Sequence, residues 1–273
     1  MTNFARSRDA LARIGAAYYA FLTYFGAMAI LAVHSVGYFL RVLVGRAAVN
    51  RFRRREIASQ MVRVGIRAVP IVTLVLLFVG MVIAFQMAYV LRKVGLKDWV
   101  AQIVAVSMLR ELGPLLTAVV MSGFAGASIA AELGTMVVGE EIEALRSEAL
   151  DPVKFLVMPR VIATTVMMVC LTVVANIVGI FGGFIVATQI LGVNPYMYYE
   201  YTVKALETQD LITGLIKAGA FGLLISLIAC YLGLKVSGGA EGVGRATTLA
   251  VVFGIVGIIA TDLVFSALFY LVL

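Results

Sequence analysis

Long apolar runs alternate with short polar segments along this chain, and the alternation predicts its secondary structure. Five runs exceed about 18 residues and carry few charges: 66–91, 114–136, 155–191, 211–234 and 247–272. A helix rises about 1.5 Å per residue, so about 20 apolar residues cross the hydrocarbon core of a bilayer. The pattern therefore predicts an all-α polytopic membrane protein with five transmembrane helices. The third run is long enough to need tilt, a kink or an extramembrane end.

Two further apolar segments do not fit as spans. Segment 99–113 is short and Pro114 follows it, so we expect the helix to break there or the segment to lie at the outer interface. Segment 14–45 has arginines on both sides, and a single crossing would place one arginine cluster outside. We expect a re-entrant or interfacial helical hairpin bent near 34–37. It belongs to a basic N-terminal segment, 1–54, that precedes a transmembrane domain at 55–273.

The composition supports the membrane class and excludes several kinds of site. The chain is 62% hydrophobic and 14% charged, with a net charge of +7, which we interpret as a topology signal and not as a nucleic-acid footprint. A single histidine, His34, excludes histidine-based catalytic or metal sites, and Cys170 and Cys230 lie in apolar runs. The glycine-rich loop 237–248 lacks the Lys-Ser/Thr pair of a phosphate-binding loop. We therefore predict no enzyme, no metal and no cofactor in this chain.

The basic residues orient the spans. If the acidic segment 139–152 is cytoplasmic, eleven Lys and Arg residues share its side and four lie opposite, as the positive-inside rule requires. The cytoplasmic group is Arg51, Arg53, Arg54, Arg55, Arg63, Arg67, Arg146, Lys154, Arg160, Lys235 and Arg245. The opposite group is Arg92, Lys93, Lys97 and Lys204. A tyrosine-rich segment, 196–201, then falls in an outer loop, where interfacial tyrosines are expected.

The acidic segment GEEIEALRSEALDP, 139–152, holds five of the fifteen acids of the chain. Its spacing predicts a short amphipathic helix over 140–150, with Gly139 as N-cap and an end at Asp151 before Pro152. The acids Glu140, Glu141, Glu143, Glu148 and Asp151 would form one face, and Ile142, Leu145, Arg146, Ala149 and Leu150 the other. The segment could lie on the membrane surface with its acids in water. An acidic face is better suited to a basic groove on a protein than to anionic lipid.

Several ionisable residues lie at membrane depth, where charge is costly. They are Arg110, Glu111, Glu132, Lys217 and Asp262. The alternatives are a functional role or an internal pair that fixes helix packing, and a lone Asp such as Asp262 more often bonds a neighbouring helix than moves a proton. The spacings Gly179-xxx-Gly183 and Ser122-xxx-Gly126-xxx-Ala130 predict close helix packing, within one subunit or across a dimer.

The run LRELGPLLTAVVMSGFAGASIAAELGTMVVGEEIEALRSEALDPVKFLVMPR resembles the MlaE/YrbE family of ABC-transporter permeases, which includes the chloroplast TGD permease. The resemblance covers roughly 55–273 and implies a phospholipid permease of the bacterial inner (cytoplasmic) membrane that works as a homodimer. It also implies two separate ATPase subunits that bind ATP and Mg²⁺, and a ring of MCE-domain proteins that receives lipid on the far side. Segment 139–151 would be the coupling helix, with Glu140, Glu141, Glu143, Leu145, Arg146 and Asp151 facing the ATPase.

The resemblance also indicates a lipid cavity at the dimer interface, with Phe85, Gln86, Phe124 and Asp262 as candidate residues. Phe124 stands where relatives often carry Arg. Ala149 replaces a frequent Gly, and we expect it to strengthen the coupling helix, since Ala exceeds Gly in helix propensity by about 1 kcal/mol. The alternative function is an ion-coupled secondary transporter that uses Glu111, Glu132 or Asp262, although no internal repeat supports it.

Overall fold

The computed structural model describes residues 26, 37, 51–93, 95 and 99–272. The chain divides into two compact units, Met1–Ala48 and Val49–Leu273. The predicted hairpin at 14–45 lies, apart from Gly26 and Gly37, outside the described residues and stays a prediction. Nearly all the described residues therefore belong to the second unit.

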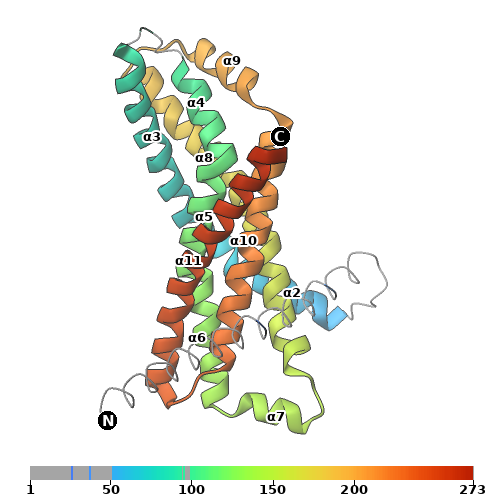
Figure 1. Cartoon of the computed structure of the whole chain (residues 1–273). Helices are drawn as coiled ribbons and strands as arrows, with labels where there is room; N and C mark the ends of the chain where they lie inside the picture. Colours follow the sequence, from blue (N-terminus) through green and yellow to red (C-terminus); the bar gives the residue numbers. More distant parts are fainter. Residues whose placement is uncertain (1–25, 27–36, 38–50, 94, 96–98, 273) are drawn as a thin grey trace, which may run out of the picture. The chain divides into compact units, whose positions relative to one another are not determined.

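The second unit is a bundle of long helices, and its described residues include no β-strand (Figure 1). In chain order its α-helices are α2 (Arg51–Val64), α3 (Val69–Lys93), α4 (Val100–Ser107), α5 (Gly113–Met121), α6 (Ala127–Val138), α7 (Glu141–Ser147), α8 (Met158–Gln189), α9 (Pro195–Ala205), α10 (Thr208–Leu234) and α11 (Gly239–Val272). A short 3₁₀ turn, Ile66–Ala68, joins α2 to α3. Three π-helical turns, Met108–Leu112, Ser122–Gly126 and Val153–Val157, join α4 to α5, α5 to α6 and the loop after α7 to α8.

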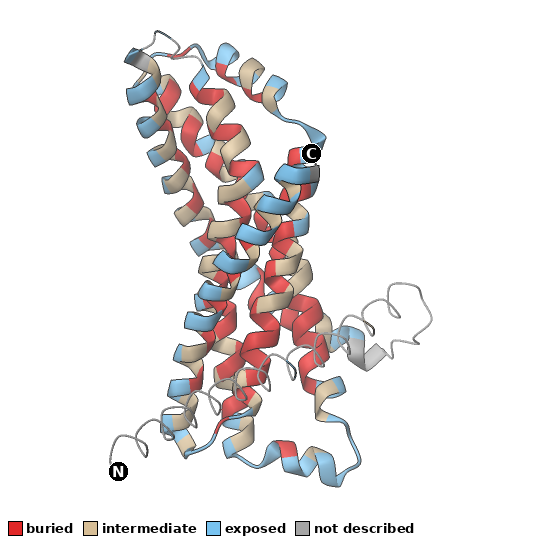
Figure 2. Cartoon of the chain, in the orientation of Figure 1, coloured by how far each residue is buried: buried red, intermediate tan, exposed pale blue. Residues whose placement is uncertain are grey.

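Five helical runs in the described residues are long and apolar enough to cross a membrane, which confirms the predicted class. They cover Arg54–Leu91, Val100–Val138, Val153–Gln189, Thr208–Leu234 and Gly239–Leu271. Short helices lie at the two ends of the bundle, α7 at one and α9 at the other (Figure 1). Buried residues gather where the long helices face one another, and exposed residues follow their outer surfaces (Figure 2). This is the distribution expected when lipid surrounds the bundle.

The predicted break at Pro114 is wrong. The helix continues from Val100 to Val138, and the π turn Met108–Leu112 lies directly before the proline. Inside an α-helix the proline ring clashes with the carbonyl four residues earlier. The wider turn closes with a bond from the Gly113 amide to the Met108 carbonyl, which redirects the neighbouring carbonyls and lets the helix pass the proline.

The interpretation of 237–248 as a loop is also wrong for most of the segment. Helix α11 begins at Gly239, eight residues before the predicted start of the last span. Gly238 and Gly239 have φ angles of +89° and +67°, a conformation that other residues rarely adopt. These two glycines turn the chain between α10 and α11.

Helices α3 and α8 cross at a distance that only glycine allows. A Cβ on Gly80 would lie 1.9 Å from the Gly179 carbonyl oxygen, and one on Gly182 would lie 2.3 Å from the Leu77 carbonyl oxygen. On the Ser122 spacing, the Ser122 hydroxyl donates to the Val251 carbonyl of α11 at 3.2 Å. In the structure, therefore, both small-residue spacings predicted to allow close packing make contacts within the subunit.

The tyrosine-rich segment is a helix and not a loop. In α9, Asn194 caps the first turn by accepting from the Tyr196 amide at 2.9 Å, and Pro195 follows as the first helical residue. Tyr198 is buried and donates its hydroxyl to the Ile180 carbonyl of α8 at 3.1 Å. Burial raises the pKa of Tyr198, so its hydroxyl stays a donor. Tyr196 and Tyr199 are exposed at the surface of this end.

We predict that Gly80→Ala lowers the stability of the bundle by about 1–3 kcal/mol, because the new methyl group must push α3 away from the backbone of α8. At this chain length the melting temperature should fall by roughly 3–10 °C in detergent. Gly123→Ala is the matched control, since a Cβ there meets no atom within 4 Å. Equal melting temperatures for the two variants would contradict the close crossing.

Candidate functional site

The predicted acidic helix exists as α7, but it is shorter than expected. It covers Glu141–Ser147, against the predicted 140–150. Ile142 is buried and Leu145 partly buried, while Glu141, Glu143 and Arg146 are exposed. The helix is therefore amphipathic, as predicted, and lies at one end of the bundle (Figure 1).

The predicted N-cap is wrong by one residue. Gly139 is the C-cap of α6, and Glu140 is the N-cap of α7, with a φ angle of +59° and no side-chain capping bond. The Glu140 amide donates to the Val137 carbonyl at 3.1 Å, and its carbonyl accepts from the Ala144 amide at 3.0 Å. Glu140 thus closes one helix and opens the next in a single left-handed residue, which makes the turn between α6 and α7 very short.

The expected effect of Ala149 is also wrong, because Ala149 lies beyond the helix. Its φ angle is +60°. The Ala149 amide donates to the Arg146 carbonyl at 3.0 Å and the Leu150 amide to the Leu145 carbonyl at 3.0 Å. This pair of bonds is the Schellman motif, whose left-handed position favours glycine. Alanine therefore weakens the end of α7 instead of strengthening the helix.

Asp151 caps the helix that follows α7. Its Oδ1 accepts from the Val153 amide at 3.0 Å, and Pro152 stands at the first helical position. Its Oδ2 lies 3.4 Å from Lys154 Nζ. The prediction that α7 ends at Asp151 is therefore wrong: α7 ends at Ser147, and the Asp-Pro pair starts the third span.

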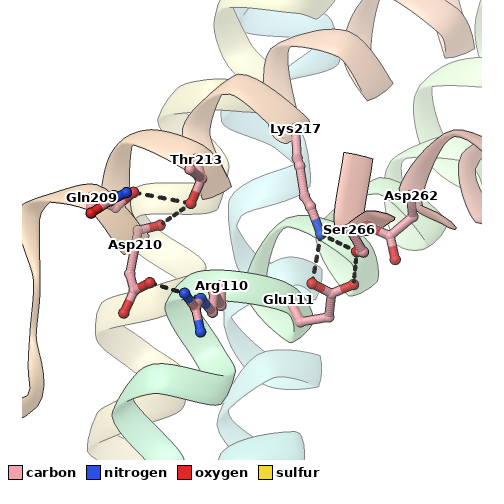
Figure 3. Close-up of polar contacts among 8 residues, drawn as sticks. All are labelled: Arg110, Glu111, Gln209, Asp210, Thr213, Lys217, Asp262 and Ser266. Atoms are coloured by element: carbon pink, nitrogen blue, oxygen red, sulfur yellow. Dashed lines mark hydrogen bonds and ion pairs between the residues drawn. The ribbon is translucent and has the colours of Figure 1, made fainter. Parts of the chain in front are cut away.

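Three of the charged residues at membrane depth, Glu111, Lys217 and Asp262, form one network that joins three helical segments (Figure 3). Lys217 of α10 is buried, and its Nζ lies 2.6 Å from Glu111 Oε2 and 3.0 Å from Asp262 Oδ1 of α11. Ser266, one turn beyond Asp262, accepts from Lys217 Nζ at 2.8 Å and donates to Glu111 Oε1 at 3.0 Å. Asp262 thus contacts the neighbouring α10 through its ion pair with Lys217. One lysine therefore faces two carboxylates at membrane depth and offsets one of their two negative charges.

Arg110 and Glu111 do not pair with each other. Arg110 Nε lies 2.8 Å from Asp210 Oδ1, so the two adjacent residues reach different positions on α10 (Figure 3). The sequence reasoning missed Asp210 and Ser266. Their spacing held the signal, since Asp210 and Lys217 are seven residues apart, and Asp262 and Ser266 four, on single helix faces.

A cavity of about 510 Å³ opens beside this network. It is lined by Arg110, Glu111, Thr213, Lys217, Ser266, Phe269 and Tyr270. Two cationic groups, one carboxylate and two aromatic rings therefore line the same cavity, which suits an amphipathic ligand.

Glu132 pairs with two arginines near the α7 end. Its Oε1 lies 2.5 Å from Arg63 Nη1 of α2 and 3.3 Å from Arg160 Nη2 of α8. The Arg160 Nη1 also donates to the Leu156 carbonyl at 2.7 Å. The sequence indicated only that both arginines lie on the cytoplasmic side. No spacing in the sequence connects residues 63, 132 and 160.

The structure separates the candidate cavity residues. Phe85 lines a second cavity of about 560 Å³ with Ala88, Tyr89, Lys93, Ile190 and Leu191, between α3 and the end of α8. Gln86 is exposed on α3, and Phe124 is partly buried in the π turn Ser122–Gly126. Asp262 lies in the charged network instead. Of these four residues, only Phe85 lines either of the two cavities described.

The described residues contain no cluster of three or more His, Cys, Asp or Glu side chains that could hold a metal ion. Cys170 is an exposed and Cys230 a buried free thiol.

Comparison with known proteins decides the family. The model of the family described as permease MlaE matches residues 57–268, which is most of the chain. The chain belongs to the MlaE permease family. As an MlaE permease, it is a transport subunit and not an enzyme.

Curated relatives agree with this assignment. A probable ABC transporter permease protein of Rickettsia felis is 41% identical over 214 residues, covering 78% of this chain and 83% of the relative. The intermembrane phospholipid transport system permease protein MlaE of Haemophilus influenzae is 31% identical over 215 residues, covering 78% and 82%. The chloroplast protein TRIGALACTOSYLDIACYLGLYCEROL 1 of Arabidopsis thaliana is 34% identical over 231 residues, covering 85% and 65%.

We predict that Ala149→Gly stabilises the end of α7 in this MlaE permease. Relief of the left-handed strain, less the added flexibility of the unfolded chain, should contribute about 0.5–1 kcal/mol. Hydrogen exchange of the α7 amides should slow roughly two- to fivefold. Ala144→Gly, the same change in the middle of α7, should accelerate this exchange by a similar factor. Faster exchange in Ala149→Gly would contradict the assigned cap.

We predict that Lys217→Met destabilises the protein by about 3–5 kcal/mol, because two carboxylates then lose their counter-charge away from water. The melting temperature should fall by roughly 5–15 °C. Adding Glu111→Gln should restore part of this loss. Lys204→Met is the control, since its pair with Glu200 is exposed and contributes at most about 1 kcal/mol. A loss no larger than that of the control would contradict the network.

Proposed function

We propose that this chain is the permease subunit of an ABC transporter that moves phospholipid between membranes, driven by a separate ATPase subunit that docks on α7. The family assignment supports the class, and the printed name of the Haemophilus relative supports the substrate. The single observation that carries the coupling is the position and charge of α7. It is the one short amphipathic helix, among the described residues, between two membrane-spanning runs at its end of the bundle.

The geometry of α7 suits the transmission of force. Its buried Ile142 anchors the helix, while Glu141 and Glu143 stay exposed for a basic groove on the ATPase. The left-handed Glu140 and the capped turn at Ala149 leave short connections to α6 and to the third span. A displacement of α7 therefore moves the ends of two spanning helices. Glu140, Leu145, Arg146 and Asp151 complete the coupling surface in this proposal.

The substrate class fits the two cavities. A phospholipid combines an anionic phosphate with apolar chains, and Arg110 and Lys217 lie beside Phe269 and Tyr270 in the first cavity. In the second, Lys93 lies 4.3 Å from the ring centroid of Tyr89, at the edge of a wall that is otherwise apolar. Phe85, Gln86 and Phe124 remain candidates for a larger lipid cavity that forms only when two copies of the chain meet.

The proposed assembly is a homodimer with two ATPase subunits, which bind ATP and Mg²⁺, and an MCE-domain ring on the α9 side. We place it in the bacterial inner membrane with α7 in the cytoplasm, where the excess of Lys and Arg is expected. The apolar outer faces of α3 and α11, which include Phe78, Val82, Val256 and Leu263, would contact lipid or the second copy.

The alternative of an ion-coupled transporter gains little from the geometry. Glu111, Glu132 and Asp262 each lie within 3.3 Å of a lysine or arginine nitrogen. Acids that already have such partners favour a packing or gating role over a proton relay.

We predict that Glu140→Lys with Glu143→Lys uncouples the permease from its ATPase. Two reversed charges repel a basic groove, so co-purification of the ATPase and phospholipid transport in proteoliposomes should each fall at least tenfold. The variant should still insert and dimerise, which size-exclusion chromatography in detergent measures.

Glu241→Lys is the control for the single variant Glu143→Lys, because each change replaces one exposed glutamate with lysine. Glu241 is exposed in the first turn of α11, and its change adds the same charge outside α7. The control should keep both ATPase and transport. A double α7 variant that retains the ATPase and transports phospholipid at the normal rate would refute the docking role.

A further inference from the structure

Glu132 joins three helices near the α7 end, through one carboxylate oxygen shared by two guanidinium groups. Arg63 of α2 lies at 2.5 Å and Arg160 of α8 at 3.3 Å from Oε1. We call Arg63, Glu132 and Arg160 the Glu132 triad. The three residues lie far apart in the sequence, so the order of the helices along the chain does not predict that they meet.

Two members of the triad, Glu132 and Arg160, lie on α6 and α8, the long helices that precede and follow α7 along the chain. Glu132 precedes Glu140 by eight residues, and Arg160 follows Pro152 by eight, so each lies about 12 Å along its helix from the turn. The ion pair Glu132–Arg160 therefore joins α6 to α8 on the two sides of α7. A displacement of α7 that moves α6 or the third span acts on this pair.

The two arms of the triad differ in burial. The side chain of Arg160 is 5% exposed, whereas that of Arg63 is 45% exposed. A buried guanidinium needs its counter-charge, so the Arg160 arm is required for folding. The more exposed Arg63 arm contributes less to stability. Its loss should therefore leave the fold intact, so that a role in movement can be tested separately.

The Arg63 arm leads to the first span. Arg63 lies in the last turn of α2, and the chain continues through Ile66–Ala68 into α3 as one run, Arg54–Leu91. The far end of this run carries Phe85 and Tyr89, which line the second cavity. A force on Glu132 therefore acts on one end of the first span, and the other end of this span lines the second cavity, a candidate lipid site.

We propose that Arg63 and Glu132 are positioning residues that carry the displacement of α7 to the first span. The inference rests on the proposed function, since it requires an ATPase that displaces α7. When α6 moves, Glu132 pulls the start of the first span through Arg63, and α3 tilts about its glycine crossing with α8. Without the Arg63 arm, α7, α6 and α8 still move, but this tilt of the first span is lost.

The test uses Arg63→Gln in the permease purified with its ATPase and reconstituted in proteoliposomes. Phospholipid moved per ATP hydrolysed should fall at least fivefold, while the ATPase still co-purifies and the melting temperature changes by less than about 2 °C. Arg63→Lys keeps the charge and should stay within twofold of the parent. Arg67→Gln, an exposed arginine four residues further on, is the control and should also stay within twofold.

A second readout does not depend on the substrate. Spin labels at Ser59→Cys of α2 and Thr248→Cys of α11, both exposed positions, with Cys170→Ser, report the distance between the helices with and without trapped nucleotide. The nucleotide-dependent change should vanish in Arg63→Gln and persist in Arg67→Gln.

The outcomes separate the two proposals. A distance change that requires Arg63, in a complex that moves no phospholipid, would refute the proposed substrate and support the linkage. Normal transport per ATP and a normal distance change in Arg63→Gln would overturn the linkage alone. Loss of the ATPase or of thermal stability in Arg63→Gln would show a structural role and overturn it as well.

Discussion

The absence of water from the hydrocarbon core is the constraint on which the rest of this structure depends. Backbone polar groups and charges there must find partners inside the protein. The π turn before Pro114 meets this demand for the backbone, since it carries the helix past a residue that cannot donate. Lys217 meets it for the side chains by serving two carboxylates and a serine. The π turn also carries Glu111, the partner of Lys217 and Ser266, so the second span is locally irregular and is tied to α10 and α11 at the same place.

In the proposed coupling, the ion pairs between helices and the close glycine crossings decide how a movement of α7 passes through the bundle. Glycine crossings hold α3 against α8 at backbone contact, which fixes the point where the two helices cross. At the α7 end, Glu132 joins α6 to α2 and to α8. At greater depth the Lys217 network joins the remaining helices. In this proposal, a small displacement of α7 is passed between packed elements instead of being absorbed by loops.

Sequence reasoning succeeded where one segment decides its own structure. The five spans follow from run length, and the existence of α7 follows from its acid and apolar spacing. It failed at ends and junctions. Pro114 does not break its helix, and Ala149 occupies a left-handed cap where helix propensity does not apply. In both cases the local rule assumed a regular α-helix. The π turn and the Schellman cap replace that conformation, and they depend on hydrogen bonds that the sequence alone does not show.

By itself, the sequence determined the membrane class, the number of spans, the charged residues at depth and the amphipathic character of the segment at 139–152. These properties follow from the free energy of transferring single segments into lipid, and that free energy is nearly additive along the chain. Only the tertiary structure decided the partners: Arg110 with Asp210, Lys217 with Glu111 and Asp262, and Glu132 with Arg63 and Arg160. A pairing between distant residues depends on helix rotation and crossing, which are set by the packing of all the helices together.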